Sequence, residues 1–84
     1  MNWYKKSQED FGSIVVNEYG EESYKWPKGW SCSVKKEKDG LYWSALRLEG
    51  NLVQSFPGDY ASQSRKAAFE WLQWYLKGGK NQMQ

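Results

Sequence analysis

The dipeptide Asp39-Gly40 separates two runs of residues with strand character, 30–38 and 41–48. Aspartate and glycine both tolerate positive φ, so this pair is typical of the two-residue type I′ turn of a β-hairpin. That turn would fix the register of the two strands and place Val34 opposite Ala45. The sequence therefore predicts an antiparallel hairpin that reverses at Asp39-Gly40.

The predicted register divides the side chains of this hairpin between two faces, because successive residues of a strand point to opposite sides. The face that we expect to form the core carries Trp30, Cys32, Val34, Trp43 and Ala45. The other, outer face is expected to carry Ser31, Ser33, Lys35, Tyr42, Ser44, Leu46 and Leu48.

The remaining elements complete a single domain over residues 1–84. Residues 13–17 are rich in β-branched side chains and predict a first strand. A strand over 52–56 is expected after the hairpin. If a two-residue loop at Gly50-Asn51 precedes this strand, Phe56 lies on the core face, whereas a three-residue loop exchanges the two faces of the strand. Apolar residues spaced by four predict a helix near the C-terminus. We expect an α+β fold in which three to four short antiparallel strands pack against this helix. The expected parts are a polar N-terminal segment at 1–12, the strands at 13–56, the helix at 60–77 and a tail at 78–84.

Composition narrows the function classes. Six Trp, six Tyr and three Phe can build a core in 84 residues. The chain has no histidine and only one cysteine, Cys32, which we expect to be buried. The lack of histidine and of a second cysteine excludes catalytic triads, an intramolecular disulfide and zinc knuckles. No glycine-rich phosphate loop is present. We therefore expect no enzymatic activity, cofactor or metal. We also expect a cytoplasmic location, because neither a signal peptide nor a membrane-spanning run is found in the sequence.

Charge is unevenly distributed along the chain. Residues 25–47 carry six cationic side chains against two carboxylates, whereas residues 1–24 carry two against five. Nucleic-acid binding needs cations for phosphates and planar groups or donors for bases and sugars. These requirements predict a nucleic-acid site, with DNA the first candidate, made by Lys25, Trp26, Lys28, Lys35, Lys36, Lys38, Tyr42 and Arg47.

A family resemblance points in the same direction. The glycine-bounded strands and the helix that follows resemble the arm-binding domain of phage-type tyrosine integrases and the plant ethylene-response-factor domain, through Gly40, Trp43, Ala45, Arg47, Gly50, Phe56 and Ala67-Ala68. The resemblance implies a three-stranded sheet that enters the DNA major groove and is supported by one helix. The chain departs from both families in the insertion at 57–61 and in its small number of arginines. The start of the helix, at 64–68, is also similar to that of double-stranded-RNA-binding domains.

Two other interpretations stay open. In the first alternative the protein binds another protein, as a phage or mobile-element accessory protein binds a host factor. The binding residues would then be Leu46, Leu48, Trp71 and Trp74. In the second alternative residues 1–24 cover the outer face, with Ile14 and Val16 packed on Leu46 and Leu48, and no binding face remains there.

Overall fold

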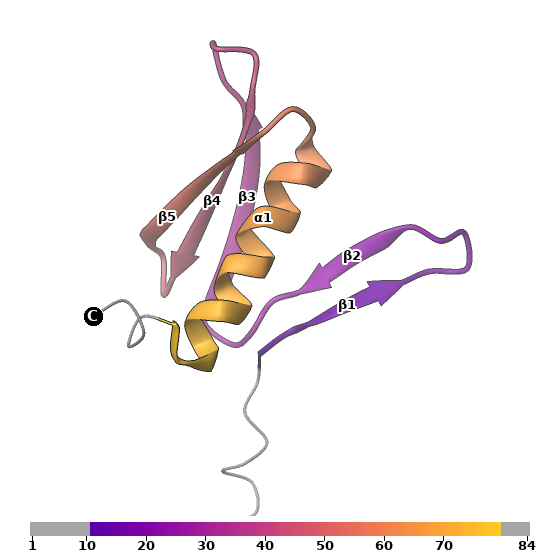
Figure 1. Cartoon of the computed structure of the whole chain (residues 1–84), viewed down its shortest axis with the longest axis vertical. Coiled ribbons are helices and arrows are strands. Elements are labelled where there is room, and N and C mark those ends of the chain that lie inside the picture. The colour runs from indigo at the N-terminus through magenta and orange to yellow at the C-terminus, as the bar shows by residue number, and fades with distance from the viewer. Residues whose placement is uncertain (1–10, 80–84) are drawn as a thin grey trace, which may run out of the picture.

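The computed structural model describes residues 11–79 of the chain, so most of the predicted N-terminal segment and of the predicted tail lies outside the described residues. Two antiparallel sheets and one C-terminal helix form an α+β domain, as the sequence predicts (Figure 1). The elements are β1 (Ser13–Val16), β2 (Glu22–Lys25), β3 (Trp30–Lys36), β4 (Tyr42–Leu48), β5 (Asn51–Gly58), α1 (Ala61–Trp74) and the π-helical turn η2 (Tyr75–Gly79). Strands β1 and β2 pair with each other, and the second sheet has the order β3-β4-β5.

The hairpin between β3 and β4 does reverse at Asp39-Gly40, but with a three-residue loop. The backbone N–H of Glu37 donates to the carbonyl of Leu41 at 2.8 Å, and that of Gly40 donates to the carbonyl of Glu37 at 3.0 Å. Gly40 has φ 87°, whereas Asp39 does not adopt positive φ. The predicted type I′ turn is therefore wrong: the loop is a tight turn followed by a left-handed glycine, the common three-residue alternative.

This longer loop moves the register by one residue and exchanges the two faces of β4. Val34 pairs with Ser44 instead of Ala45. Ser44 and Leu46 are fully buried, and Trp30, Cys32 and Val34 on the same side of β3 are half-buried. The predicted faces of β3 are thus correct, but those of β4 are wrong: Trp43 and Ala45 lie on the outer face, and Tyr42, Ser44, Leu46 and Leu48 lie on the helix side.

The type I′ turn of this protein joins β4 to β5. Glu49 and Gly50, with φ 54° and 86°, form the two-residue loop that pairs Leu48 with Asn51. The register then shifts by one residue at a bulge between Leu46 and Arg47, which places Phe56 opposite Ser44 on the helix side. The predicted two-residue loop is therefore correct in length, although it lies at Glu49-Gly50, and Phe56 faces the core as that loop predicts, because the bulge restores the alternation.

Helix α1 packs along the sheet through a stripe that includes Ser64, Ala68, Phe69 and Leu72, all buried. These residues recur at the spacing of one helical face, as the sequence predicts. The predicted helix, 60–77, is observed as α1 followed by η2. At the seam with β5 an aromatic cluster forms, in which Trp71 lies 5.8 Å from Phe56 and is stacked on Tyr75 at 4.9 Å between ring centroids.

Strands β1 and β2 form a hairpin, Ser13–Lys25, that we call the arm. It projects away from the three-stranded sheet on the far side of the helix (Figure 1). The base of the arm packs on the helix: the rings of Tyr24 in β2 and of Trp26, the residue after the arm, lie 4.8 and 5.4 Å from the ring of Phe69. Ile14 and Val16 are 47% and 58% exposed, so the arm does not cover the outer face, and the interpretation that they pack on Leu46 and Leu48 is wrong.

Candidate nucleic-acid interface

The side of the three-stranded sheet that points away from α1 is the candidate interface, and we call it the outer face. Its residues follow from the observed register: Ser31, Ser33, Lys35, Trp43, Ala45, Arg47, Leu52, Ser55 and Pro57. The residues on the two edge strands are exposed, and the three on the central strand are half-exposed. The set contains two cations and no carboxylate.

Arg47 is held in place on this face by a neighbouring strand. Its Nη1 donates to the hydroxyl of Ser33 at 3.1 Å, across the β3–β4 pairing. One bond of this kind leaves most of the five N–H donors of a guanidinium available for another group. Lys35 is exposed on the same face of β3. The two cations are therefore displayed on one surface by adjacent strands.

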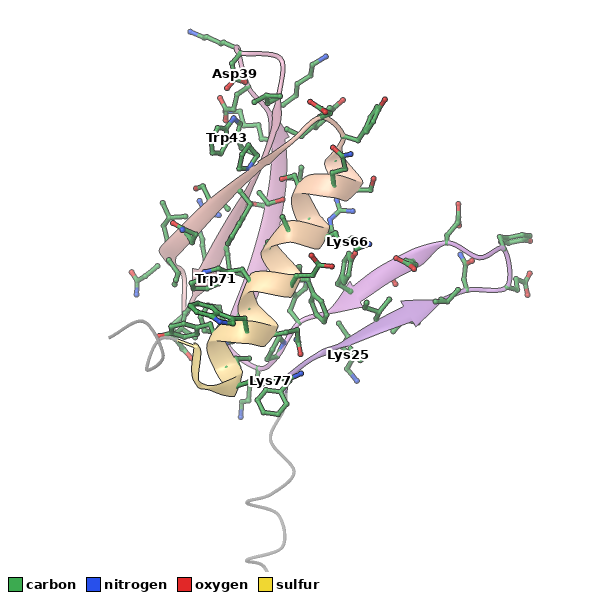
Figure 2. All side chains as sticks on the ribbon, in the orientation of Figure 1. Lys25, Asp39, Trp43, Lys66, Trp71 and Lys77 are labelled. Carbon is green, nitrogen blue, oxygen red and sulfur yellow. The ribbon has the colours of Figure 1, made fainter. Side chains whose placement is uncertain are left out.

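Trp43 lies at the end of the outer face that is nearer to the β3–β4 loop. Its indole Nε1 donates to Oδ2 of Asp39 at 3.1 Å, and Oδ1 of Asp39 accepts the N–H of Leu41 at 2.9 Å (Figure 2). One side chain thus stabilises the turn and orients the indole ring. A shallow hollow of about 450 Å³ borders this ring, lined by Glu37, Lys38, Asp39, Trp43 and Ser55.

The predicted nucleic-acid site is only partly assembled. Lys35 and Arg47 share the outer face, and Lys38 is exposed in the loop at its end. Tyr42 lies instead on the helix side, and Lys36 lies there too, with its Nζ 5.8 Å from the centre of the Tyr42 ring. The placement of Tyr42 on the outer face was wrong for the same reason as that of Ser44, namely the one-residue shift of register.

The first three residues of that predicted set lie elsewhere. Trp26 packs against Phe69 at the base of the arm, and its ring is half-buried. Lys25 ends β2 and is exposed on the arm, on the opposite side of the helix from Trp43 (Figure 2). Lys28 is exposed in the turn before β3. These residues are thus not part of the outer face.

The residues of the alternative protein-binding site do not form one surface. Leu46 is fully buried beneath the helix, so its predicted exposure is wrong. Leu48 lies on the same helix side of β4. Trp71 belongs to the aromatic cluster at the seam with β5, and Trp74, 38% exposed, lies next to it at 6.2 Å between ring centroids.

Sequence reasoning missed Trp43 as a surface residue, although a signal was present. In β4, Leu46 and Leu48 alternate with Arg47. Alternation of leucine with a charged residue favours the leucine side as the core. This pattern predicts that Trp43 and Arg47 lie together on the outer face, in agreement with the observed register.

Other kinds of site find little support in residues 11–79. Burial raises the pKa of the Cys32 thiol, and a hydrogen bond with Ser44 and the charges of Arg65 and Arg47 oppose this rise. A thiol of this kind is a poor nucleophile. In the same residues no group of three metal-binding side chains comes together, and no helix has the length and apolar character needed to cross a membrane.

Comparison with known proteins adds no relative. The chain matches no protein-family model, no curated protein and no solved structure.

Proposed function

We propose that the protein is a non-enzymatic module that binds duplex nucleic acid, with DNA as the first candidate, through the outer face of its three-stranded sheet. The observation that carries this proposal is the charge of that face. Lys35 and Arg47 are its two ionic groups, with no carboxylate among the residues that share it. Phosphate contacts by such cations supply most of the affinity of non-specific nucleic-acid binding.

The shape of the face supports the same partner. Four of its nine side chains are small, namely Ser31, Ser33, Ala45 and Ser55, so a duplex can approach the backbone of the sheet closely beside them. Three strands spaced by about 4.8 Å span roughly 10 Å. The major groove of B-form DNA is about 12 Å wide and admits β-strands as well as a helix.

The side chains fall into distinct roles under this proposal. Lys35 and Arg47 contact phosphates, and the bond from Arg47 to Ser33 reduces the side-chain freedom lost on binding. Trp43, oriented by Asp39, offers an apolar plane to a sugar or a thymine methyl group. The serine hydroxyls are donors and acceptors for base edges or phosphates.

The experiment is a titration of the protein with labelled duplex and single-stranded DNA and RNA at two salt concentrations. We expect duplex binding at low salt that weakens steeply as salt rises, because bound phosphates release counterions. The double variant Lys35→Ala/Arg47→Ala should bind at least tenfold more weakly and show a flatter salt dependence.

The matched control is Lys77→Ala, which removes an exposed cation from η2, outside the outer face. It should leave both affinity and salt dependence close to those of the unchanged protein. Absence of duplex binding at low salt, or equal losses in the control and in the double variant, would overturn the proposal. Stronger binding of single strands than of duplex would reject the groove-binding geometry.

A further inference from the structure

Several apolar side chains of the arm are exposed to solvent. Ile14 and Val16 lie on one of its faces and Val15, 48% exposed, on the other, while Tyr19 at the turn is 79% exposed. A two-stranded hairpin without further packing is at best marginally stable in water. Exposed apolar side chains gathered on one projecting element are typical of a contact surface.

The three-stranded sheet has a free edge at β3 to which a further strand can pair. Just beyond the two ends of β3, Glu37 donates to Leu41 and Gly29 accepts from Glu49. The residues of β3 that bond to β4 are therefore the alternate ones between these two, namely Ser31, Ser33 and Lys35. In an antiparallel ladder the intervening residues direct their N–H and C=O groups to the other side. No strand among the described residues pairs with these groups of β3. This edge is therefore open to an added strand.

The charges of the two elements are complementary. The arm carries three exposed carboxylates, those of Glu18, Glu21 and Glu22, against one exposed lysine, Lys25, a net charge of −2. The end of β3 and its loop carry three exposed lysines, Lys35, Lys36 and Lys38, against the carboxylates of Glu37 and Asp39, a net charge of +1. Antiparallel pairing of two β3 edges would place the lysine-bearing end of each strand beside the Trp30 end of the other, so it would not join opposite charges. Pairing of β3 with an arm brings opposite charges together instead.

The arm of each chain points away from the β3 edge of the same chain. In Figure 1 the arm diverges from the β3 side of the body, so that its own tip points away from β3. A single chain thus holds its acidic arm away from its lysine-bearing edge.

We infer that two copies of this chain associate reciprocally, with the arm of each copy lying along the free β3 edge of the other. This arrangement buries the β-branched residues of both arms and pairs their carboxylates with the lysines of β3. A reciprocal exchange has two-fold symmetry and closes after two copies. The contact runs along the edge of β3 and involves only Lys35 of the outer face, so the inference does not depend on the proposed nucleic-acid function.

The first test is sedimentation analysis of the protein over a concentration series, without nucleic acid. We expect the mass of two chains at high concentration. The variant Ile14→Ser/Val16→Ser should dissociate at least tenfold more readily with an unchanged circular dichroism spectrum, because both residues are exposed. Leu52→Ser, which changes an equally exposed residue of the body, is the control and should associate normally.

The second test exchanges the charges. Glu18→Lys/Glu22→Lys reverses the arm, and Lys36→Glu/Lys38→Glu reverses the β3 end. Each variant alone should be monomeric, because like charges then meet. An equimolar mixture of the two should recover the two-chain mass, since each arm again meets a strand end of opposite charge. A monomer at every concentration, a mass that grows without limit, normal association of the arm variant or a mixture that stays monomeric would each overturn the inference.

Discussion

The hydroxyl groups of Ser44 on the central strand and Ser64 on the helix lie 2.5 Å apart, and both residues are fully buried. The Ser64 hydroxyl also donates to the carbonyl of Phe56 on β5 at 2.7 Å. This polar contact links two strands and the helix within an otherwise apolar and aromatic core. It fixes how the helix sits on the sheet, because an unpaired buried hydroxyl is unfavourable.

Removal of one partner of this pair should destabilise the fold. Ser64→Ala leaves the Ser44 hydroxyl and the Phe56 carbonyl with one partner fewer, and we expect a loss of about 1–3 kcal/mol in the free energy of unfolding. The double variant Ser44→Ala/Ser64→Ala should lose less than the sum of the single changes. Urea denaturation measures all three, with Ser62→Ala on the exposed side of α1 as control. Equal effects of Ser64→Ala and Ser62→Ala would show that the contact contributes nothing.

The two turns that connect the strands of the three-stranded sheet should respond in opposite ways to substitution. Glu49 has φ 54°, a conformation that asparagine tolerates better, so Glu49→Asn should stabilise the protein by about 0.5–1 kcal/mol. Asp39→Gly should destabilise it by about 1 kcal/mol, since the carboxylate accepts bonds from Leu41 and Trp43. Thermal denaturation is the measurement. If Asp39 occupied the first position of a type I′ turn, glycine there would instead be tolerated.

The base of the arm should be far more sensitive than its tip. Phe69 is 5% exposed and contacts the rings of Tyr24 and Trp26, so Phe69→Ala should cost about 3–5 kcal/mol of unfolding free energy. Val15→Ala on the exposed arm should change it by less than about 0.5 kcal/mol when the protein is dilute. Chemical denaturation at low concentration tests both. A small effect of Phe69→Ala would mean that the arm is not anchored on the helix.

The pH dependence of stability should report on Cys32. Burial raises the pKa of this thiol in the folded protein. Above about pH 8.5 the thiol of the unfolded chain ionises while the folded one keeps its proton, so the unfolded state gains stability. Between about pH 8 and pH 10, which spans the ordinary thiol pKa, the unfolding free energy of the unchanged protein should therefore fall. It should fall by more than the unfolding free energy of the Cys32→Ala variant. Parallel curves for the two proteins would show that the thiol is not protected.

Local sequence signals determined the elements of this protein. The pair Asp39-Gly40 marks a reversal whichever turn forms there, because glycine is needed for its positive φ. Likewise the spacing of Ala68, Phe69 and Leu72 predicts the buried side of the helix without knowledge of its partner. The strand β2 was missed, since its residues 22–25 are polar and follow an acidic loop.

Only the tertiary structure decided which face of β4 is buried. One residue in a loop reverses every side chain of a strand, and a dipeptide compatible with two loop lengths cannot distinguish them. The burial of Ser44 and Leu46 against α1 selects one register and moves Trp43 and Arg47 to the surface. The exposure of the arm was likewise beyond local reasoning, because β-branched residues predict a strand but not what covers it.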